Sequence, residues 1–172
     1  MNITRRLGSL AAATLLTGTA AIVAPSAQAA PSCGIHWGSL PKAAGTLWPA
    51  AATGLRAGKH PCFDRLVLDV SGEVKGYSVR YVDEVTEDGS GFGVPLAGGA
   101  KLQVTAYAGG TRRLASPSTR GYRTFRQVTW AGSFEGYTTV GVGVRARLPF
   151  RVFVLDGPGS GSRLVVDVAH RW

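Results

Sequence analysis

The sequence predicts an all-β protein, an antiparallel β-sandwich with an irregular N-terminal arm. Several short segments alternate apolar and polar residues, which is the pattern of half-buried strands. Turn residues separate these segments, and the chain contains 24 glycines in 172 residues. No long stretch shows the spacing of an amphipathic helix. We therefore expect about seven or eight short strands in one domain, because the length leaves no room for two comfortable ones.

The most informative segments are two near-copies of one strand, at residues 65–70 and 163–168. Both read Arg-Leu-Val-x-Asp-Val, with alternate residues on opposite faces. We interpret them as equivalent strands that bracket the domain, although amphipathic strands in a valine-rich chain can also resemble each other by chance. We expect Asp69 and Asp167 to pair with Arg65, with Arg163 or with backbone on an exposed face. A catalytic carboxylate pair is the less favoured interpretation.

Other strands follow from the same alternation. Further strands are predicted at residues 77–82, 100–107, 122–130, 137–148 and 150–155. The first of these is expected to form a hairpin with the strand that begins at residue 63. The last is apolar on both faces and is expected at the centre of its sheet. Residues 109–121 are expected to form a mobile polar loop that buries little surface. Gly141 and Gly143 indicate either a bulge or the close approach of another backbone or a ligand.

The N-terminus has the features of a secretory signal peptide over residues 1–29. Arg5 and Arg6 precede an apolar run, and Ala27-Gln28-Ala29 resembles a cleavage site. A membrane anchor is disfavoured, because glycine, proline and hydroxyl residues interrupt the run. We expect an irregular arm at residues 30–60 and a β domain at residues 61–172. The mature product is then extracellular or associated with the cell wall, has no membrane span, and is a monomer.

The two cysteines are predicted to form a disulfide. Cys33 and Cys62 are the only cysteines in the chain, and a secretory route leads to an oxidising compartment. Closing a loop of this length contributes roughly 3 kcal/mol by the chain-entropy model. A zinc site is disfavoured because the spacing is wrong for tetrahedral ligands. We expect neither a metal nor a cofactor.

The charge is concentrated in the second half of the chain. Residues 101–172 contain eleven basic and three acidic groups, whereas residues 30–100 contain six basic and seven acidic ones. This distribution predicts an electropositive face that attracts anionic wall polymers, acidic glycans or lipid headgroups. Nucleic acid is not expected as a partner outside the cell. The acidic run at residues 83–88 lacks EF-hand spacing and is interpreted as a solvated turn rather than a calcium site.

Arginines alternate with aromatic residues around residues 112–130. Guanidinium groups pair with carboxylates or phosphates, and aromatic rings stack, so this pattern is typical of a groove for anionic sugars or phosphates. An ordinary exposed strand of a basic protein has the same pattern. The candidate ligand-binding residues are Arg112, Arg113, Tyr122, Arg123, Arg126 and Trp130.

The sequence does not predict an enzyme. His36, His60 and His170 are scattered, and neither His-Glu-x-x-His nor Gly-x-Ser-x-Gly occurs. No catalytic residue is therefore assigned.

Several strand sequences together carry a family resemblance. Residues 60–70, 76–82 and 94–102, followed by residues 141–153 and 163–168, resemble the AMIN-like domain of secreted and lipoprotein actinobacterial proteins. The resemblance implies a sandwich of two similar sheets and a role in holding proteins at the cell envelope. The chain lacks the lipid-attachment motif of the lipoprotein relatives, and it carries no amidase domain.

We therefore expect a secreted, non-catalytic module that binds peptidoglycan or an anionic wall polymer. The alternative is a protein-interaction module, or an inhibitor, that acts on a secreted or envelope protein.

Overall fold

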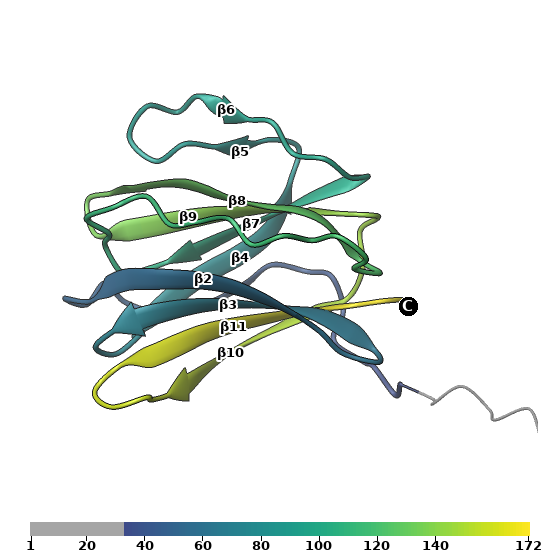
Figure 1. Ribbon diagram of the computed structural model, residues 1–172, viewed down its shortest axis with the longest axis horizontal. Coiled ribbons are helices and arrows are strands. Elements are labelled where there is room, and N and C mark those ends of the chain that lie inside the picture. Colours follow the sequence, from purple (N-terminus) through teal and green to yellow (C-terminus); the bar gives the residue numbers. More distant parts are fainter. Residues whose placement is uncertain (1–32) are drawn as a thin grey trace, which may run out of the picture. The chain divides into compact units, whose positions relative to one another are not determined.

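The computed structural model describes residues 33–172, and within them it is an all-β structure of two antiparallel sheets packed face to face (Figure 1). The predicted β-sandwich is confirmed, whereas the predicted signal peptide lies outside the described residues. The five-stranded sheet has the order β1 (Lys42–Gly45), β4 (Gly76–Val82), β7 (Ala100–Ala106), β9 (Tyr137–Val144) and β8 (Phe125–Phe134). The four-stranded sheet has the order β10 (Phe150–Asp156), β11 (Ser162–Ala169), β3 (Phe63–Ser71) and β2 (Ala51–Lys59).

The core lies between the two sheets and follows the alternation of the sequence. In β3, Leu66 and Leu68 are buried, and in β7 the same is true of Leu102 and Val104. Each such side chain contributes roughly 1.5–3 kcal/mol through burial. Because the polar residues of these strands face outward, the outer faces of both sheets carry the groups that can meet a ligand.

The two copies of the repeated strand are direct neighbours at the centre of the four-stranded sheet. β3 and β11 pair antiparallel, with Arg65 opposite Asp167 and Asp69 opposite Arg163. Because the two copies run in opposite directions, each arginine lies opposite the aspartate of the other copy in the register, and Arg65 forms an ion pair with Asp167. The repetition therefore encodes charge complementarity across the sheet.

Two strand placements predicted from the sequence are wrong. β4 does not form a hairpin with β3, because the connection after Gly72 crosses to the other sheet. Ser162 fixes this crossing: its Oγ accepts a hydrogen bond from Val74 N at 2.8 Å and donates to Gly72 O at 2.7 Å. β10 is an edge strand rather than a central one. Its outward Phe153 lies against arginine side chains instead of a second apolar layer.

The N-terminal arm contains more strand than expected. β1 and β2 lie in residues where the sequence predicted an irregular segment. Their small residues have little strand preference of their own, and pairing with β4 and β3 orders them. Trp37 packs on Phe63, with ring centroids 5.6 Å apart, whereas Trp48 remains 46% exposed.

The predicted disulfide is confirmed. Cys33 and Cys62 are bonded across a sequence separation of 29 residues. The bond ties the first described residues to the chain just before β3. It thereby holds the segment that carries Trp37 near Phe63.

The connection between β7 and β8 packs more closely than the sequence predicted. Leu114 lies in the core with 4% of its surface exposed, so the expectation of a loop that buries little is wrong at this residue. On either side of it, Arg112 contacts β2 and Arg113 contacts Trp130 of β8. The connection therefore spans the open side of the sandwich between the edge strands β2 and β8.

A small hairpin covers part of the outer face of the five-stranded sheet. It consists of β5 (Val85–Thr86) and β6 (Gly93–Val94) and lies at the top of Figure 1. Val85 and Val94 pack there with Ala131 in a second small core. The segment after β6 runs close over β9, where a side chain at Gly141 would meet Leu96 and one at Gly143 would meet the Ala97 carbonyl. Close backbone approach thus explains Gly143, whereas Gly141 leaves room for the Leu96 side chain.

Candidate ligand-binding surfaces

Four arginines of the connection between β7 and β8, together with one at the start of β8, form a surface that we call the basic strip. It consists of Arg112, Arg113, Arg120, Arg123 and Arg126. Their recorded hydrogen bonds go to backbone carbonyls. Arg112 Nη2 donates to Thr53 O at 2.9 Å, and Arg126 Nη1 lies 3.2–3.4 Å from three carbonyl oxygens of its own segment. Within residues 33–172, no carboxylate forms an ion pair with any of the five. Their charges are available to an external anion.

A depression of about 330 Å³ lies where the strip meets β2. Arg56, Arg112 and Arg113 line it together with Asp69. Arg56 donates two hydrogen bonds to the Asp69 carboxylate, at 2.7 and 2.6 Å, so this pair is internally neutral. The charges of the two strip arginines remain. The depression can therefore receive a carboxylate or a phosphate.

The six candidate residues fall into two groups. Arg112, Arg113 and Trp130 form the first, with the Arg113 guanidinium 5.5 Å from the centroid of the Trp130 ring. Trp130 is only partly exposed, and its Nε1 is buried without a hydrogen-bond partner among the described residues. The Trp130 ring therefore packs against the Arg113 guanidinium and does not offer an open face to a sugar.

Tyr122, Arg123 and Arg126 form the second group, at the other end of the connection. The Tyr122 ring stacks on Phe125 at 5.9 Å, with Lys59 Nζ 5.1 Å from the ring centroid. Burial raises the pKa of Tyr122, and the negative charge of Asp64 adds to this effect. Tyr122 thus packs against the sandwich, while the exposed Arg123 extends the positive charge.

A buried carboxylate that sequence reasoning missed anchors this end of the strip. Asp64 is 1% exposed, and its Oδ2 accepts hydrogen bonds from Thr124 N at 2.6 Å and Phe125 N at 2.9 Å. His170 Nδ1 lies 3.0 Å from the Thr124 hydroxyl, and its Nε2 lies 4.0 Å from Asp64. The arrangement contains the residue types of a catalytic triad. However, the Thr124 hydroxyl is fully buried and donates to Ala169 O at 3.0 Å. It therefore has a structural role, which is to connect the residue before β8 to the end of β11.

A second arginine cluster lies on the outer face of the four-stranded sheet, and one carboxylate, that of Asp167, compensates part of its charge. Asp167 is fully buried and accepts hydrogen bonds from Arg65 at 2.6 and 2.9 Å and from Arg151 at 2.8 Å. The hydrogen bond to Asp167 raises the pKa of Arg65. The rings of Trp37, Phe63 and Phe153 lie within 5.4 Å of one or both guanidinium groups. The Asp167 pairing predicted from the repeat is confirmed for Arg65, although this carboxylate is buried rather than exposed. Asp69 pairs with Arg56 instead of Arg163.

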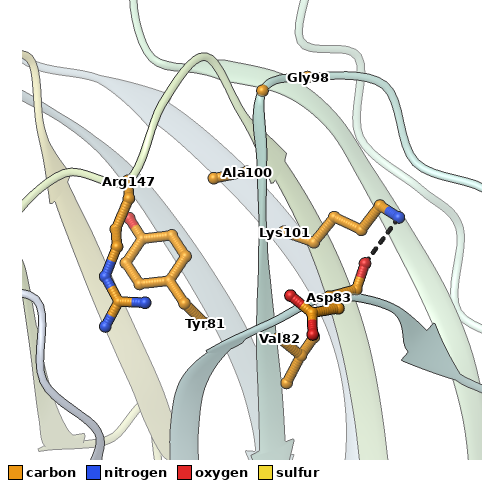
Figure 2. A pocket seen from close by; sticks show the side chains of 8 residues that line it. Tyr81, Val82, Asp83, Gly98, Ala100, Lys101 and Arg147 are labelled. Atoms are coloured by element: carbon orange, nitrogen blue, oxygen red, sulfur yellow. Dashed lines mark hydrogen bonds between the residues drawn. The ribbon is translucent and has the colours of Figure 1, made fainter.

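Figure 2 shows a third feature, a notch of about 330 Å³ near the end of β4. Tyr81 occupies one side, and its hydroxyl donates to Leu148 O at 2.8 Å and accepts from Leu148 N at 3.0 Å. Burial raises the pKa of this hydroxyl. On the other side, Lys101 Nζ donates to Asp83 O at 2.8 Å. Gly98 has a φ of +124° and lies against the Val144 carbonyl, which leaves no room for a side chain. Because these polar groups are already engaged, we interpret the notch as a structural corner.

Comparison with known proteins gives one match. The family model of the AMIN-like domain matches residues 50–170, well over half of the chain. The chain belongs to the AMIN-like domain family. No match was found among curated proteins or among solved structures. The matched interval contains β2, every later strand and the basic strip.

Membership of the AMIN-like family indicates the kind of role. AMIN-like domains are generally non-catalytic binding modules, and the family suggests association with the cell envelope. The family and the disulfide are both consistent with an extracytoplasmic protein. Within residues 33–172, no helix is long and apolar enough to cross a membrane.

Proposed function

We propose that this AMIN-like protein is a secreted, non-catalytic module that binds an anionic polymer of the cell envelope, with peptidoglycan as the first candidate. The observation that carries the proposal is the basic strip, whose five arginines form no ion pair with a described carboxylate. Elsewhere on the surface, arginines such as Arg56 and Arg65 are held by aspartates of the chain itself.

The chemistry of the strip supports an anionic ligand. Arginine presents a planar fork of donors that matches carboxylate and phosphate oxygens. Bacterial walls contain both groups, in peptide stems and in phosphate-bearing polymers. The depression beside Arg112 and Arg113 gives one such group a place to enter, while the rest of the strip extends the attraction along the polymer.

Co-sedimentation tests the proposal. Purified protein is mixed with insoluble peptidoglycan, with and without its attached anionic polymers, at low and at high salt. We expect sedimentation at low salt and a marked decrease at high salt, because exposed charges are screened beyond about 10 Å at 0.1 M ionic strength. Retention that needs the attached polymers identifies them as the ligand. No sedimentation of either material at low salt contradicts the proposal.

The alternative is a secreted or envelope protein as the partner. Cross-linking in culture distinguishes the two. One dominant cross-linked protein, together with no sedimentation on either wall material, would replace polymer binding with protein binding.

A further inference from the structure

A groove on the outer face of the five-stranded sheet is separate from the basic strip. We call it the sheet groove, and its volume is about 330 Å³. Its floor consists of Ser78 and Arg80 from β4 and Gln103 and Thr105 from β7. These residues face each other in register, Ser78 with Thr105 and Arg80 with Gln103, so they form two polar rows across neighbouring strands.

The floor has unused hydrogen-bonding capacity. Within residues 33–172, the side chains of Ser78, Arg80 and Gln103 make no hydrogen bond to another residue, whereas Thr105 bonds to the Thr139 hydroxyl at 3.0 Å. The floor therefore presents a hydroxyl, an amide and a guanidinium side by side. Together these groups offer both donors and acceptors to a ligand.

Asp88, beside the floor, carries the strongest indication of a ligand. It belongs to the segment between β5 and β6, and its Oδ2 is buried without a hydrogen-bond partner among the described residues. A buried polar atom without a partner is costly, and native structures contain few of them. Burial raises the pKa of Asp88, although hydrogen bonds with Thr139 act in the opposite direction. A rotation of the Asp88 carboxylate toward the groove would let a ligand hydroxyl donate to this oxygen.

Aromatic rings form the sides of the groove. Phe134 is 52% exposed and Tyr137 is 37% exposed, and Tyr137 meets Tyr107 edge to face at 5.2 Å. Gly89, with a φ of +87°, lies directly against the Phe134 ring, so a side chain there would displace it. Aromatic walls above a floor of a few polar groups are typical of sites for small organic ligands.

The charged residues of the lining and the pairing of the floor strands limit the class of ligand that the groove can bind. The lining contains one basic residue, Arg80, and two acidic residues, Asp88 and Glu135, so the groove does not favour a polyanion. An added peptide strand is also disfavoured at the floor, because β7 is paired on both sides and β1 covers the outer edge of β4 over residues 76–79. A pyranose ring fits both constraints: its apolar face can lie on the rings while its hydroxyls pair with the floor.

We propose that the sheet groove binds the pyranose rings of an uncharged oligosaccharide, with Gln103 and Asp88 pairing to ring hydroxyls and Tyr137 stacking on a ring face. The site goes beyond the proposed function, because it recognises the neutral sugar backbone rather than the anionic groups. It does not use the basic strip.

The test is an NMR titration of ¹⁵N-labelled protein with chitotetraose and, separately, cellotetraose. High salt screens the basic strip during the titration. We expect amide shifts centred on β4 and β7 with at least one of the two sugars. Binding of chitotetraose alone indicates an N-acetylated wall glycan as the source, and binding of both indicates a general hexose site. The absence of shifts with either sugar, or shifts that map elsewhere, overturns the inference.

Three variants make the test specific. Q103A and Y137A should each weaken binding about tenfold, the loss expected for one good polar or stacking contact. W48A removes an exposed ring outside the groove and should change the Kd less than about twofold. Q103A changes a strand surface, so it remains informative if Y137A fails to fold, and urea unfolding checks both proteins. An unchanged Kd in Q103A and in every folded Y137A sample contradicts the site.

The same proteins separate this inference from the proposed function. R112A/R113A should bind the tetrasaccharide like the wild type. If the sugar titration shows binding in the groove but the protein does not sediment with wall material, only the proposed function is contradicted. Normal sedimentation without sugar shifts removes only the groove.

Discussion

The arginines of the sheet surface and those of the basic strip differ in what balances their charge. Arg65 and Arg151 converge on Asp167, which is fully buried beneath them. Arg112 and Arg113 meet a backbone carbonyl and an aromatic ring instead. The same residue type therefore has two meanings here. Arg65 and Arg151, held by the carboxylate of Asp167, contribute to the fold, whereas Arg112 and Arg113, without an acidic partner among the described residues, are available to a ligand.

The largest expected loss of stability follows from removing Asp167, the partner of Arg65 and Arg151. D167A leaves two guanidinium groups next to a buried site without their counter-charge. Removing one partner of a buried ion pair typically costs about 3–5 kcal/mol, and the partial exposure of both arginines favours the lower end. Urea unfolding should show this loss in the free energy of unfolding. A loss below about 1 kcal/mol would mean that the cluster is not structural.

Breaking the disulfide should have the next largest effect. Cys33 and Cys62 close a loop of 29 residues, which contributes roughly 3 kcal/mol in the chain-entropy model. Because the bond holds the segment with Trp37 near Phe63, the double variant C33S/C62S should also expose Trp37 to water. Unfolding and tryptophan fluorescence measure the two consequences. An unchanged midpoint, with W37F as the fluorescence reference, would contradict the role assigned to the bond.

Removing arginines of the basic strip should hardly change the free energy of unfolding. R112A/R113A removes one hydrogen bond to a carbonyl and no ion pair, and exposed substitutions of this kind usually change stability by about 0.5 kcal/mol or less. The unfolding midpoint should therefore stay close to that of the wild type. A loss of stability comparable to that of D167A would mean that Arg112 and Arg113 stabilise the fold.

A small effect of the opposite sign is expected at Asp88. Burial raises its pKa, so at neutral pH the ionised carboxyl disfavours the folded state. The stabilising contribution of the protonated form is full below the unfolded pKa, about 3.9, and is lost as the pH rises through the folded pKa. D88N should therefore raise the free energy of unfolding at pH 7, by less than about 1 kcal/mol because the group is only half buried.

This gain in D88N should disappear at low pH, where the wild-type carboxyl is also neutral. The same variant should weaken sugar binding in the sheet groove. Unfolding at pH 7 and near pH 3.5, followed by the titration with chitotetraose, gives both results. A gain that persists unchanged at the lower pH would contradict the assigned cause.

The sequence predicted the features that depend on local pattern. Alternation located β7 and both copies of the repeated strand, and the cysteine count predicted the disulfide. The choice of partner strand could not be predicted, because it depends on where the chain crosses between sheets. The crossing after Gly72 is fixed by Ser162, which lies 90 residues away. β10 looked central because its outward Phe153 is apolar, but that ring packs on guanidinium groups.

The candidate sites also divide into features that local sequence pattern predicts and features that only the fold determines. Charge counting located the basic strip. It did not reveal that Tyr122 and Trp130 pack against the sandwich, because an aromatic residue next to arginine has the same sequence pattern in a core and on a surface. The sheet groove was missed for a related reason. The acidic run containing Asp88 resembles a solvated turn until the fold brings Asp88 beside Ala131 of β8 and Thr139 of β9.

The salt dependence of wall binding tests the central claim most directly. It is measured for the wild type, for R112A/R113A, and for K75A/R171A, which removes the same number of charges outside the strip. We predict that binding by the wild type and by K75A/R171A falls steeply and similarly with salt, whereas R112A/R113A binds weakly at low salt and responds little. Equal binding and equal salt dependence in all three proteins would contradict the claim that the arginines of the basic strip are the ones that bind.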